Sequence, residues 1–585
     1  MFLDKYVFFL QKNRLIKAKN LLLFAIFWQS FFLAHANETI TIKEYQYQID
    51  HTRKLIVVNQ DTEQINTQWP HSKTAVILDE QYAFTHAVPT VEIGFPYEVA
   101  NSDETNYTLY FTQLPLVNIF TPHVIVDEPR VFAEFVMSES NGNITRSNIG
   151  IEYRGGWSQS LPKKSLRIEF WEDTSGQVTK DVSLLGMRND DDWNLQAFFN
   201  EPLRVRSKTS NELWKLMHKL YYQELEPDAV NGIQMEYVEV FINGEYRGVY
   251  ALSERVDRKQ LQLKKYDYEI RGELYKAVDW GVPTLTSLPD FGNSEPYWDG
   301  FEYQHPEEVT DWINLYGFVD FVVNEKNYYF FSVHPSIFET DNAVDYFIFL
   351  NLLRANDNRG KNIFIARYDQ GEPYFYVPWD LDAVFGTMWR GDKENRTDDI
   401  LSNGLYDRLI HDCSENGFYR RLTMRWNNLR KNEITHQNIM NLFRGNFNYL
   451  SENGIYDRET TAWGEYTMDE TDLEYISEWL TARLSFLDGE FNKPCIPHDN
   501  SGEEDEFIKV FPNPANDYFH VEINAGILPF RLKIFNQLGH TVFSEQLRSK
   551  SERLQLPNLQ PGMYFVMVQN QNFTKTQKLI VIKQF

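Results

Sequence analysis

Four polar residues between positions 354 and 386 have types and spacing that can support phosphoryl transfer. Asp357 is followed five residues later by Asn362, and a strand-like run and a turn then lead to Asp380 and Asp382. This chemistry needs a carboxylate near the acceptor hydroxyl and oxygen ligands for a divalent cation. Taken alone, the Asp–Asn spacing is more typical of acids that cap turns on a solvated surface.

The segment EPYFYVPWDLD predicts a strand that would align two of these acids. If the strand persists, Asp380 and Asp382 fall on one face and can share a cation. Carboxylates so close to an aromatic run are costly unless they are paired or bound to metal. The order Asp, Asn and then Asp after a hairpin is the order in which protein kinases place a catalytic carboxylate and two magnesium ligands.

Positive charge for the phosphates is expected in the segment from Arg154 to Ser165. Its glycines and serines predict a turn between two strands, where backbone N–H groups can meet phosphate. Strand alternation would point Lys164 toward the apolar interior, and an inward lysine needs an anion. The spacing is neither a Walker loop nor a G-x-G-x-x-G loop, and a surface turn with two solvated lysines remains the alternative. Glu254 can pair with a lysine or contact a nucleotide, although a salt bridge at a strand end fits equally well.

Composition narrows the class of protein. The 585 residues allow roughly three or four domains of about 150 residues each. Hydrophobic residues make up 42% and aromatic residues 15%, which is enough for packed cores. A net charge of −26 disfavours nucleic acid as a partner. The HExxH and GxSxG motifs are both absent, which disfavours a zinc protease and a serine hydrolase.

The first 36 residues and the two cysteines bear on the compartment. Lysines and an arginine precede a short apolar run that ends in Ala34-His35-Ala36, which predicts a secretory signal peptide. A single membrane anchor is the alternative, but the run is shorter than the ~20 residues that a span needs. We therefore expect an exported mature chain without a transmembrane span. Cys413 and Cys495 can form one disulfide in an oxidising compartment or remain two buried thiols.

Periodicity divides the mature chain into an α+β protein with β domains at both ends. The predicted parts are a small all-β module (37–115), an α+β body (116–490), an acidic linker (491–506) and a compact β-sandwich (507–585). Within the body, Asn243-Gly244 predicts a β-hairpin. Residues 345–353 predict a buried helix that leads into the Asp357 loop.

The body resembles the spore-coat CotH kinase-like family over about residues 116–490. The matching segments, in that family's order, are RGGWSQSLPKKSLRIEF, DDWNLQAFFNEPLRVRSKTSNEL, VEVFINGEYRGVYALSERVD, and NDNRGKNIFIARYD with YFYVPWDLDAVFG. The resemblance implies an atypical protein-kinase-like fold that binds ATP with Mg²⁺ or Mn²⁺ and phosphorylates proteins. It implies Asp357 as the catalytic residue and Lys164 as the lysine on the ATP phosphates. Asn362 and Asp380 are implied as metal ligands, with Asp382 as a second candidate.

The last segment resembles the C-terminal sorting domain of type IX secretion cargo. The matching residues are Phe511-Pro512-Asn513-Pro514, FRLKIFNQLGHTVF and LPNLQPGMYFVMV. This resemblance implies handling by the type IX secretion machinery, passage through the periplasm, and release or attachment at the cell surface.

Two functions follow as hypotheses. The first is an exported kinase that transfers phosphoryl groups to protein hydroxyl side chains, with Arg154, Lys164 and Glu254 as candidate nucleotide-binding residues. The second is a non-catalytic surface or adhesion protein that keeps a kinase-like scaffold.

Overall fold

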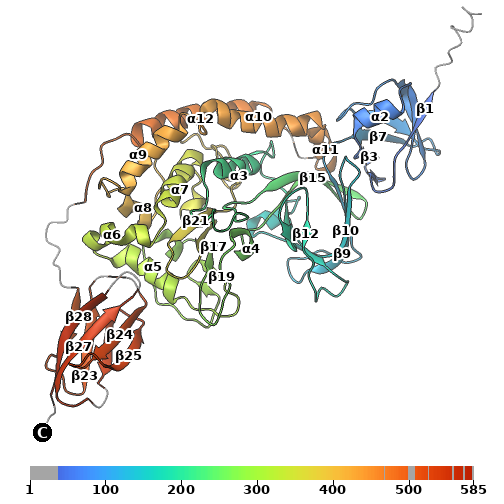
Figure 1. Ribbon diagram of the computed structural model, residues 1–585. Coiled ribbons are helices and arrows are strands. Elements are labelled where there is room, and N and C mark those ends of the chain that lie inside the picture. The colour runs from blue at the N-terminus through green and yellow to red at the C-terminus, as the bar shows by residue number, and fades with distance from the viewer. Residues whose placement is uncertain are drawn as a thin grey trace, which may run out of the picture.

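The computed structural model describes residues 37–464, 466, 468–498, 507–524, 526, 528–556, 559–570 and 574–582 (Figure 1). The predicted signal peptide, residues 1–36, lies outside the described residues, as do residues 499–506 of the predicted linker. None of the helices in the described ranges is both long enough and apolar enough to cross a membrane. The chain is a mixed α+β protein with β-rich regions near both ends.

The N-terminal region, blue in Figure 1, is built on a seven-stranded sheet in the order β1-β4-β5-β6-β7-β3-β2. Contrary to the all-β prediction, it also contains a helix, α2 (Thr62–Gln68), whose first turn is capped by the Asp61 side chain. Ile65 of this helix is buried in the core beside the sheet. The strands are β1 (Glu38–Thr41), β2 (Tyr47–Asp50), β3 (Leu55–Val58), β4 (Lys73–Ile77), β5 (Gln81–Val88), β6 (Tyr97–Ala100) and β7 (Asn106–Phe111).

Seven further strands close into a barrel in the order β10-β11-β14-β16-β15-β8-β9. Fully buried side chains such as Ile151, Ile168 and Trp193 form its core. The predicted hairpin is confirmed: Asn243 and Gly244 join β15 to β16 with φ of 51° and 77°, as a type I′ turn requires. The strands are β8 (Leu116–Phe120), β9 (Val131–Ser138), β10 (Ile144–Tyr153), β11 (Leu166–Trp171), β14 (Asp192–Gln196), β15 (Met235–Ile242) and β16 (Glu245–Ser253).

A five-stranded sheet, in the order β18-β19-β17-β20-β21, carries the residues of the candidate site. Helix α7 (Thr340–Leu353) packs on β21 and is buried along nearly its whole length, which confirms the helix predicted over 345–353. The strands are β17 (Glu273–Ala277), β18 (Tyr297–Trp298), β19 (Phe301–His305), β20 (Ile363–Arg367) and β21 (Tyr374–Pro378).

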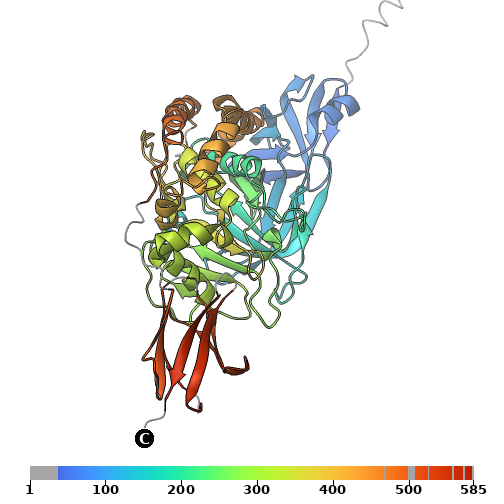
Figure 2. The same cartoon turned by 60° about the vertical axis from the view of Figure 1, so that its left-hand side comes forward.

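Several of the other helices pack around α7. α3, α9 and α12 pack against α7, α10 packs on α3 and α12, and α11 packs on the barrel strand β16 (Figures 1 and 2). Cys413 and Cys495 form a disulfide with Cα atoms 5.7 Å apart, which decides between the two alternatives. The helices are α3 (Arg206–Met217), α4 (Arg258–Leu261), α5 (Ile313–Asn324), α6 (Asn327–Val333), α8 (Gly404–Leu409), α9 (Phe418–Leu429), α10 (His436–Glu452), α11 (Ile455–Ala462) and α12 (Thr471–Glu490).

The C-terminal region, red in Figure 1, consists of a three-stranded sheet, β22-β23-β26, and a four-stranded sheet, β25-β24-β27-β28. Phe519 and Val521 of the first sheet and Leu532 and Ile534 of the second are fully buried. The strands are β22 (Ile508–Phe511), β23 (Tyr518–Ile523), β24 (Phe530–Phe535), β25 (Thr541–Leu547), β26 (Ser551–Gln555), β27 (Gly562–Gln569) and β28 (Thr574–Val581).

Candidate functional site

The loop after α7 places Asp357 at one end of the β20–β21 hairpin. Arg354, the C-cap of α7, adopts a left-handed conformation with φ of 52° and turns the chain out of the helix. A short 3-10 turn, η4 (Asp357–Arg359), then leads toward β20. The Asp357 side chain is half-buried in this turn.

Asn358 joins the two segments that carry the candidate residues. Its buried amide donates hydrogen bonds to the Asn362 carbonyl at 2.8 Å and to the Trp379 carbonyl at 2.7 Å. Its own carbonyl accepts a 2.8 Å hydrogen bond from the Tyr346 hydroxyl of α7. One side chain therefore fixes the segment before β20 against the segment after β21. The sequence pattern gave no reason to single out Asn358 among its polar neighbours.

Asp380 and Asp382 do not continue β21, so the predicted alternation is wrong beyond Pro378. The strand ends at Pro378, and Asp380 takes a φ of 54°. Asn362 has the same φ of 54°. This left-handed conformation is uncommon outside glycine, and Asn and Asp adopt it more readily than other residues. The turn exposes Asp380 and leaves Asp382 half-buried.

Neighbouring aspartates influence the ionisation of Asp357 and Asp382. Burial raises the pKa of Asp357, and the charge of Asp380 adds to that increase against the opposing charge of Lys361. Burial and the charges of Asp380 and Asp357 raise the pKa of Asp382 to about 8, although the Asn200 amide opposes them. Neighbouring carboxylates resist simultaneous ionisation, and a bound cation removes that penalty.

The types of the donor atoms suit a divalent cation. Among the described residues, none donates a hydrogen bond to the side-chain oxygens of Asp357, Asn362 or Asp380, so these oxygens remain available as ligands. Carboxylate and amide oxygens are the ligands that Mg²⁺ prefers in proteins. Backbone hydrogen bonds also hold Asn362 in place, since its N–H donates to the Ala277 carbonyl and its own carbonyl accepts from the Trp379 N–H.

Arg154 supplies a positive charge beside the acids. It follows the last residue of β10, and its guanidinium carbon lies 5.3 Å from the centroid of the Trp379 ring. Burial lowers the pKa of Arg154, while the charges of Asp380 and Asp382 oppose that effect. Arg154 has no salt bridge to any described residue, which leaves its guanidinium free to meet an anion.

Lys276 and Arg255, which the sequence did not single out, add positive charge near Arg154, although Arg255 pairs with Asp192 and Lys276 lies 3.7 Å from Glu302. Burial lowers the pKa of Lys276, which is also influenced by Glu302, Arg154 and Arg255. Lys276 lies on β17 next to β20, whereas Arg255 follows the barrel strand β16. The site therefore combines acids from the sheet with cations from both the sheet and the barrel.

Lys164 does not point inward, contrary to the expectation, and Lys163 takes that position. β11 begins only at Leu166, so strand alternation does not extend back to Lys164. The half-buried Lys164 ammonium instead donates to the Gln159 and Leu161 carbonyls.

The Lys163 ammonium is fully buried. It lies 2.7 Å from Glu459 Oε1 and 2.5 Å from the Val249 carbonyl. Burial, opposed by the Glu459 charge, lowers the pKa of Lys163 to about 7. Glu459 also accepts from Arg204, whose side chain is likewise fully buried. This lysine is closed off from solvent by its own partners.

Glu254 lies in a separate environment. Its buried carboxylate accepts hydrogen bonds from the backbone N–H groups of Arg188 at 3.2 Å and Gln234 at 2.9 Å, and from the Gln260 amide at 3.4 Å. These hydrogen bonds connect the loops around the start of β15. Among the described residues, neither a lysine nor Asp380 forms a hydrogen bond or salt bridge with Glu254. These contacts indicate that Glu254 stabilises the fold.

Asn200 and two exposed tryptophans form the rim of the site. The Asn200 amide donates to Asp382 Oδ2 at 3.3 Å and to the Trp389 carbonyl at 2.8 Å. Trp389 meets Trp157 edge to face, with ring centroids 4.7 Å apart. Asn200 lies 182 residues from Asp382 in the chain, so no local pattern could have paired them.

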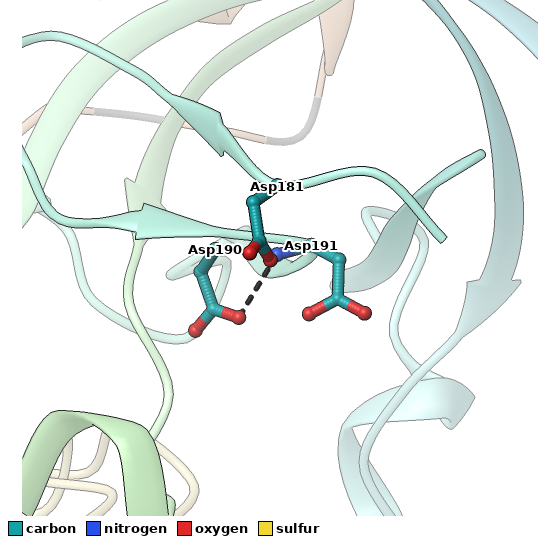
Figure 3. A group of neighbouring side chains, drawn as sticks. All are labelled: Asp181, Asp190 and Asp191. Carbon is teal, nitrogen blue, oxygen red and sulfur yellow. Dashed lines mark hydrogen bonds between the residues drawn. The ribbon is translucent and has the colours of Figure 1, made fainter. Parts of the chain in front are cut away.

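A second acidic group lies on the small hairpin β12 (Val182–Ser183) and β13 (Asn189–Asp190). Figure 3 shows the carboxylates of Asp181, Asp190 and Asp191, which are close enough together to hold a metal ion. The Lys259 ammonium lies 3.2, 3.1 and 2.8 Å from them, respectively. Because a lysine already supplies the positive charge, we do not assign a metal site here.

Comparison with known families gives two matches. The sequence model of a family described as CotH kinase protein matches residues 151–487, which include the aspartates, Asn362 and Arg154. A family described as secretion system C-terminal sorting domain matches residues 509–583. Both resemblances expected from the sequence are confirmed. No curated protein matches the chain.

Proposed function

Because the chain belongs to the CotH kinase protein family, we propose that it transfers the γ-phosphoryl group of ATP to hydroxyl side chains of a protein. The type IX sorting domain indicates export and a cell-surface location. A signal peptide in residues 1–36, passage through the periplasm and an extracellular protein substrate belong to the proposal.

The observation that supports this function best is the convergence of acids with a guanidinium, none of which forms a salt bridge with a described residue. Asp357 and Asp380 come from opposite sides of the β20–β21 hairpin, and Arg154 comes from the barrel. The charge of Asp380 acts on both Arg154 and Asp357, which supports a shared site around Asp380. An acidic metal-binding edge beside a cation is what a metal–triphosphate complex requires.

The residues divide the chemistry between them. Asp357 orients the acceptor hydroxyl and accepts its proton, and its raised pKa favours that role. Asn362 and Asp380 would hold Mg²⁺ or Mn²⁺, with Asp382 as a further ligand. The cation would neutralise negative charge on the phosphate oxygens.

Arg154 is our choice for the residue that contacts the phosphates, with Lys276 beside it. The Lys164 ammonium is engaged by two carbonyls of its own loop, and Lys163 is enclosed by Glu459. Either lysine would have to give up these partners to reach a nucleotide. Glu254 would likewise have to give up its N–H donors, so we propose no nucleotide contact for it.

The test uses the chain from residue 37 onward with labelled ATP and either Mg²⁺ or Mn²⁺. We expect metal-dependent nucleotide binding and transfer of the γ-label to protein. Asp380→Ala should weaken metal-dependent binding, whereas Asp357→Ala should mainly lower turnover because it need not touch the nucleotide. Asp398→Ala, an exposed aspartate of the same domain, is the matched control.

Three outcomes would redirect the proposal. Absence of binding and transfer with both metals would favour the non-catalytic surface protein. Transfer from the α-phosphate alone would indicate nucleotidyl transfer. Equal loss of nucleotide binding in Asp357→Ala and Asp380→Ala would contradict the division of roles.

A further inference from the structure

The C-terminal sorting domain lies against the end of α5 and the start of α6 in both views (Figures 1 and 2). Lys550, in the turn between β25 and β26, extends its ammonium to two carboxylates of the kinase domain. Nζ lies 3.0 Å from Glu325 Oε2 and 3.1 Å from Asp320 Oδ2. The Gly526 N–H donates to the same Glu325 oxygen at 2.7 Å. We call Asp320, Glu325, Gly526 and Lys550 the docking contact.

The two carboxylates need a cation where they lie. Glu325 caps the C-terminus of α5, where the helix dipole disfavours negative charge, and Asp320 lies four residues before the last residue of that helix. Their side chains are only 7% and 0% exposed, so water cannot compensate for them. Burial raises the pKa of Glu325, with Lys550 opposing it. Among the described residues, only Lys550 lies within salt-bridge distance of either acid.

An aromatic contact accompanies the ion pairs. Phe507, just before β22, meets Tyr328 and Tyr329 of α6 edge to face, with ring centroids 5.8 and 6.4 Å apart. The contact places the start of the sorting domain on the same corner of the kinase domain as Lys550. The ion pairs and the aromatic contact therefore support the same orientation of the two domains.

The interface also contains open space. A cavity of about 710 Å³ separates the two domains, lined by Tyr268 and Arg367 on one side and by Pro529 and Arg531 on the other. Where the cavity lies, the facing surfaces of the two domains do not make packing contacts. The facing surfaces of the kinase and sorting domains are therefore suited to a reversible association.

We propose that the sorting domain docks reversibly on the kinase domain through Lys550, and that this contact holds it in place until the export machinery engages it. A buried charge pair supports such a role because it fixes orientation more than it adds stability. The partner that binds this surface of the kinase domain is thus the C-terminal domain of the same chain.

Docking leaves the candidate site uncovered. Arg367 and Tyr374, at the turn of the β20–β21 hairpin, line the interdomain cavity. Asp357 and Asp380 lie at the other end of that hairpin. Release of the sorting domain should therefore leave nucleotide binding unchanged, and the inference does not depend on the proposed activity.

The test measures hydrogen exchange and small-angle scattering on the chain from residue 37 onward. In Lys550→Met we expect exchange of the Gly526 amide to rise at least tenfold and the radius of gyration to increase. Glu325→Gln should act in the same direction from the other side, and Lys550→Arg should restore protection. Lys578→Met removes an exposed lysine of the same domain and should change neither measurement.

Protection of the β24 and β27 amides in each variant shows that the sorting domain itself remains folded. With that protection intact, an unchanged Gly526 amide and an unchanged radius in Lys550→Met would overturn the proposal. Equal effects of Lys578→Met and Lys550→Met would also overturn it, because the loss would then not be specific to the docking contact.

Discussion

The buried cluster of Lys163, Arg204 and Glu459 allows a specific prediction about stability. Its one acid pairs with both cations, so loss of the acid should cost more than loss of the lysine. All three side chains are 0% exposed. Glu459 accepts from Lys163 at 2.7 Å, from the Val249 N–H at 2.7 Å and from Arg204 Nη2 at 2.9 Å. Glu459→Gln leaves the buried Arg204 guanidinium without a counter-charge and removes the charge that favours the protonated form of Lys163. Breaking a buried pair in this way costs about 3–5 kcal/mol of unfolding free energy.

Lys163→Met should cost less. Glu459 keeps Arg204 and the Val249 N–H, so no charge is left unpaired. The loss is that of charge-assisted hydrogen bonds, about 1.5–3 kcal/mol, partly offset because methionine carries no charge to desolvate. We therefore expect Glu459→Gln to be the more destabilising change by about 1–3 kcal/mol.

Urea unfolding followed by tryptophan fluorescence measures this difference, and nucleotide affinity is measured on the same samples. Lys163→Met should retain nucleotide binding, because its ammonium faces Glu459 and not solvent. Arg154→Ala should show the reverse pattern, with near-native stability and weakened binding. A Lys163→Met variant that keeps its stability but loses nucleotide binding would show that Lys163, and not Arg154, meets the phosphates.

Three further predictions concern stability and the rim of the site. Replacing Cys413 and Cys495 by serine opens an 82-residue span and should cost up to about 4.5 kcal/mol by loop entropy, measured as a lower urea midpoint. Burial alone would raise the pKa of Asp412, but hydrogen bonds from His334, Ser414 and the Phe418 N–H lower it to about 2. Its contribution of up to about 2 kcal/mol is thus complete above pH ~4 and lost as pH falls through 2, so Asp412→Asn and wild type should converge in acid unfolding. Asn200→Ala removes the link between Asp382 and the Trp389 carbonyl and should raise the KM for ATP at near-native stability, measured by steady-state kinetics.

Several elements of the fold could be predicted from local sequence patterns, because helices and tight turns depend mainly on residues close together in the chain. The apolar run over 345–353 predicts a buried helix, and Asn243-Gly244 predicts a hairpin through backbone conformations that these residues favour. The turn-forming residues around Asp357 likewise indicate where that helix must end. The family-level expectation rested on several such segments in order, and the family match confirms it.

The arrangement within the site depends on contacts that local patterns do not record. Which lysine points inward depends on where β11 begins, and the partner of Lys163 is Glu459, 296 residues away. Strand β21 ends at Pro378 and Asp380 adopts a left-handed backbone conformation, although the sequence around it still has a strand-like pattern. The role of Asn200 beside Asp382 becomes visible only in the folded structure, because the two residues are 182 positions apart in the sequence.

The most direct measurement is a crystal structure of the chain with Mn²⁺ and a non-hydrolysable ATP analogue, with the metal located by its anomalous signal. We expect the ion between Asp380 and Asn362, at oxygen distances of about 2.1 Å, with the triphosphate against Arg154. An ion bound at Asp181 and Asp190, or a triphosphate that contacts neither Arg154 nor Lys276, would contradict the assignment of this site.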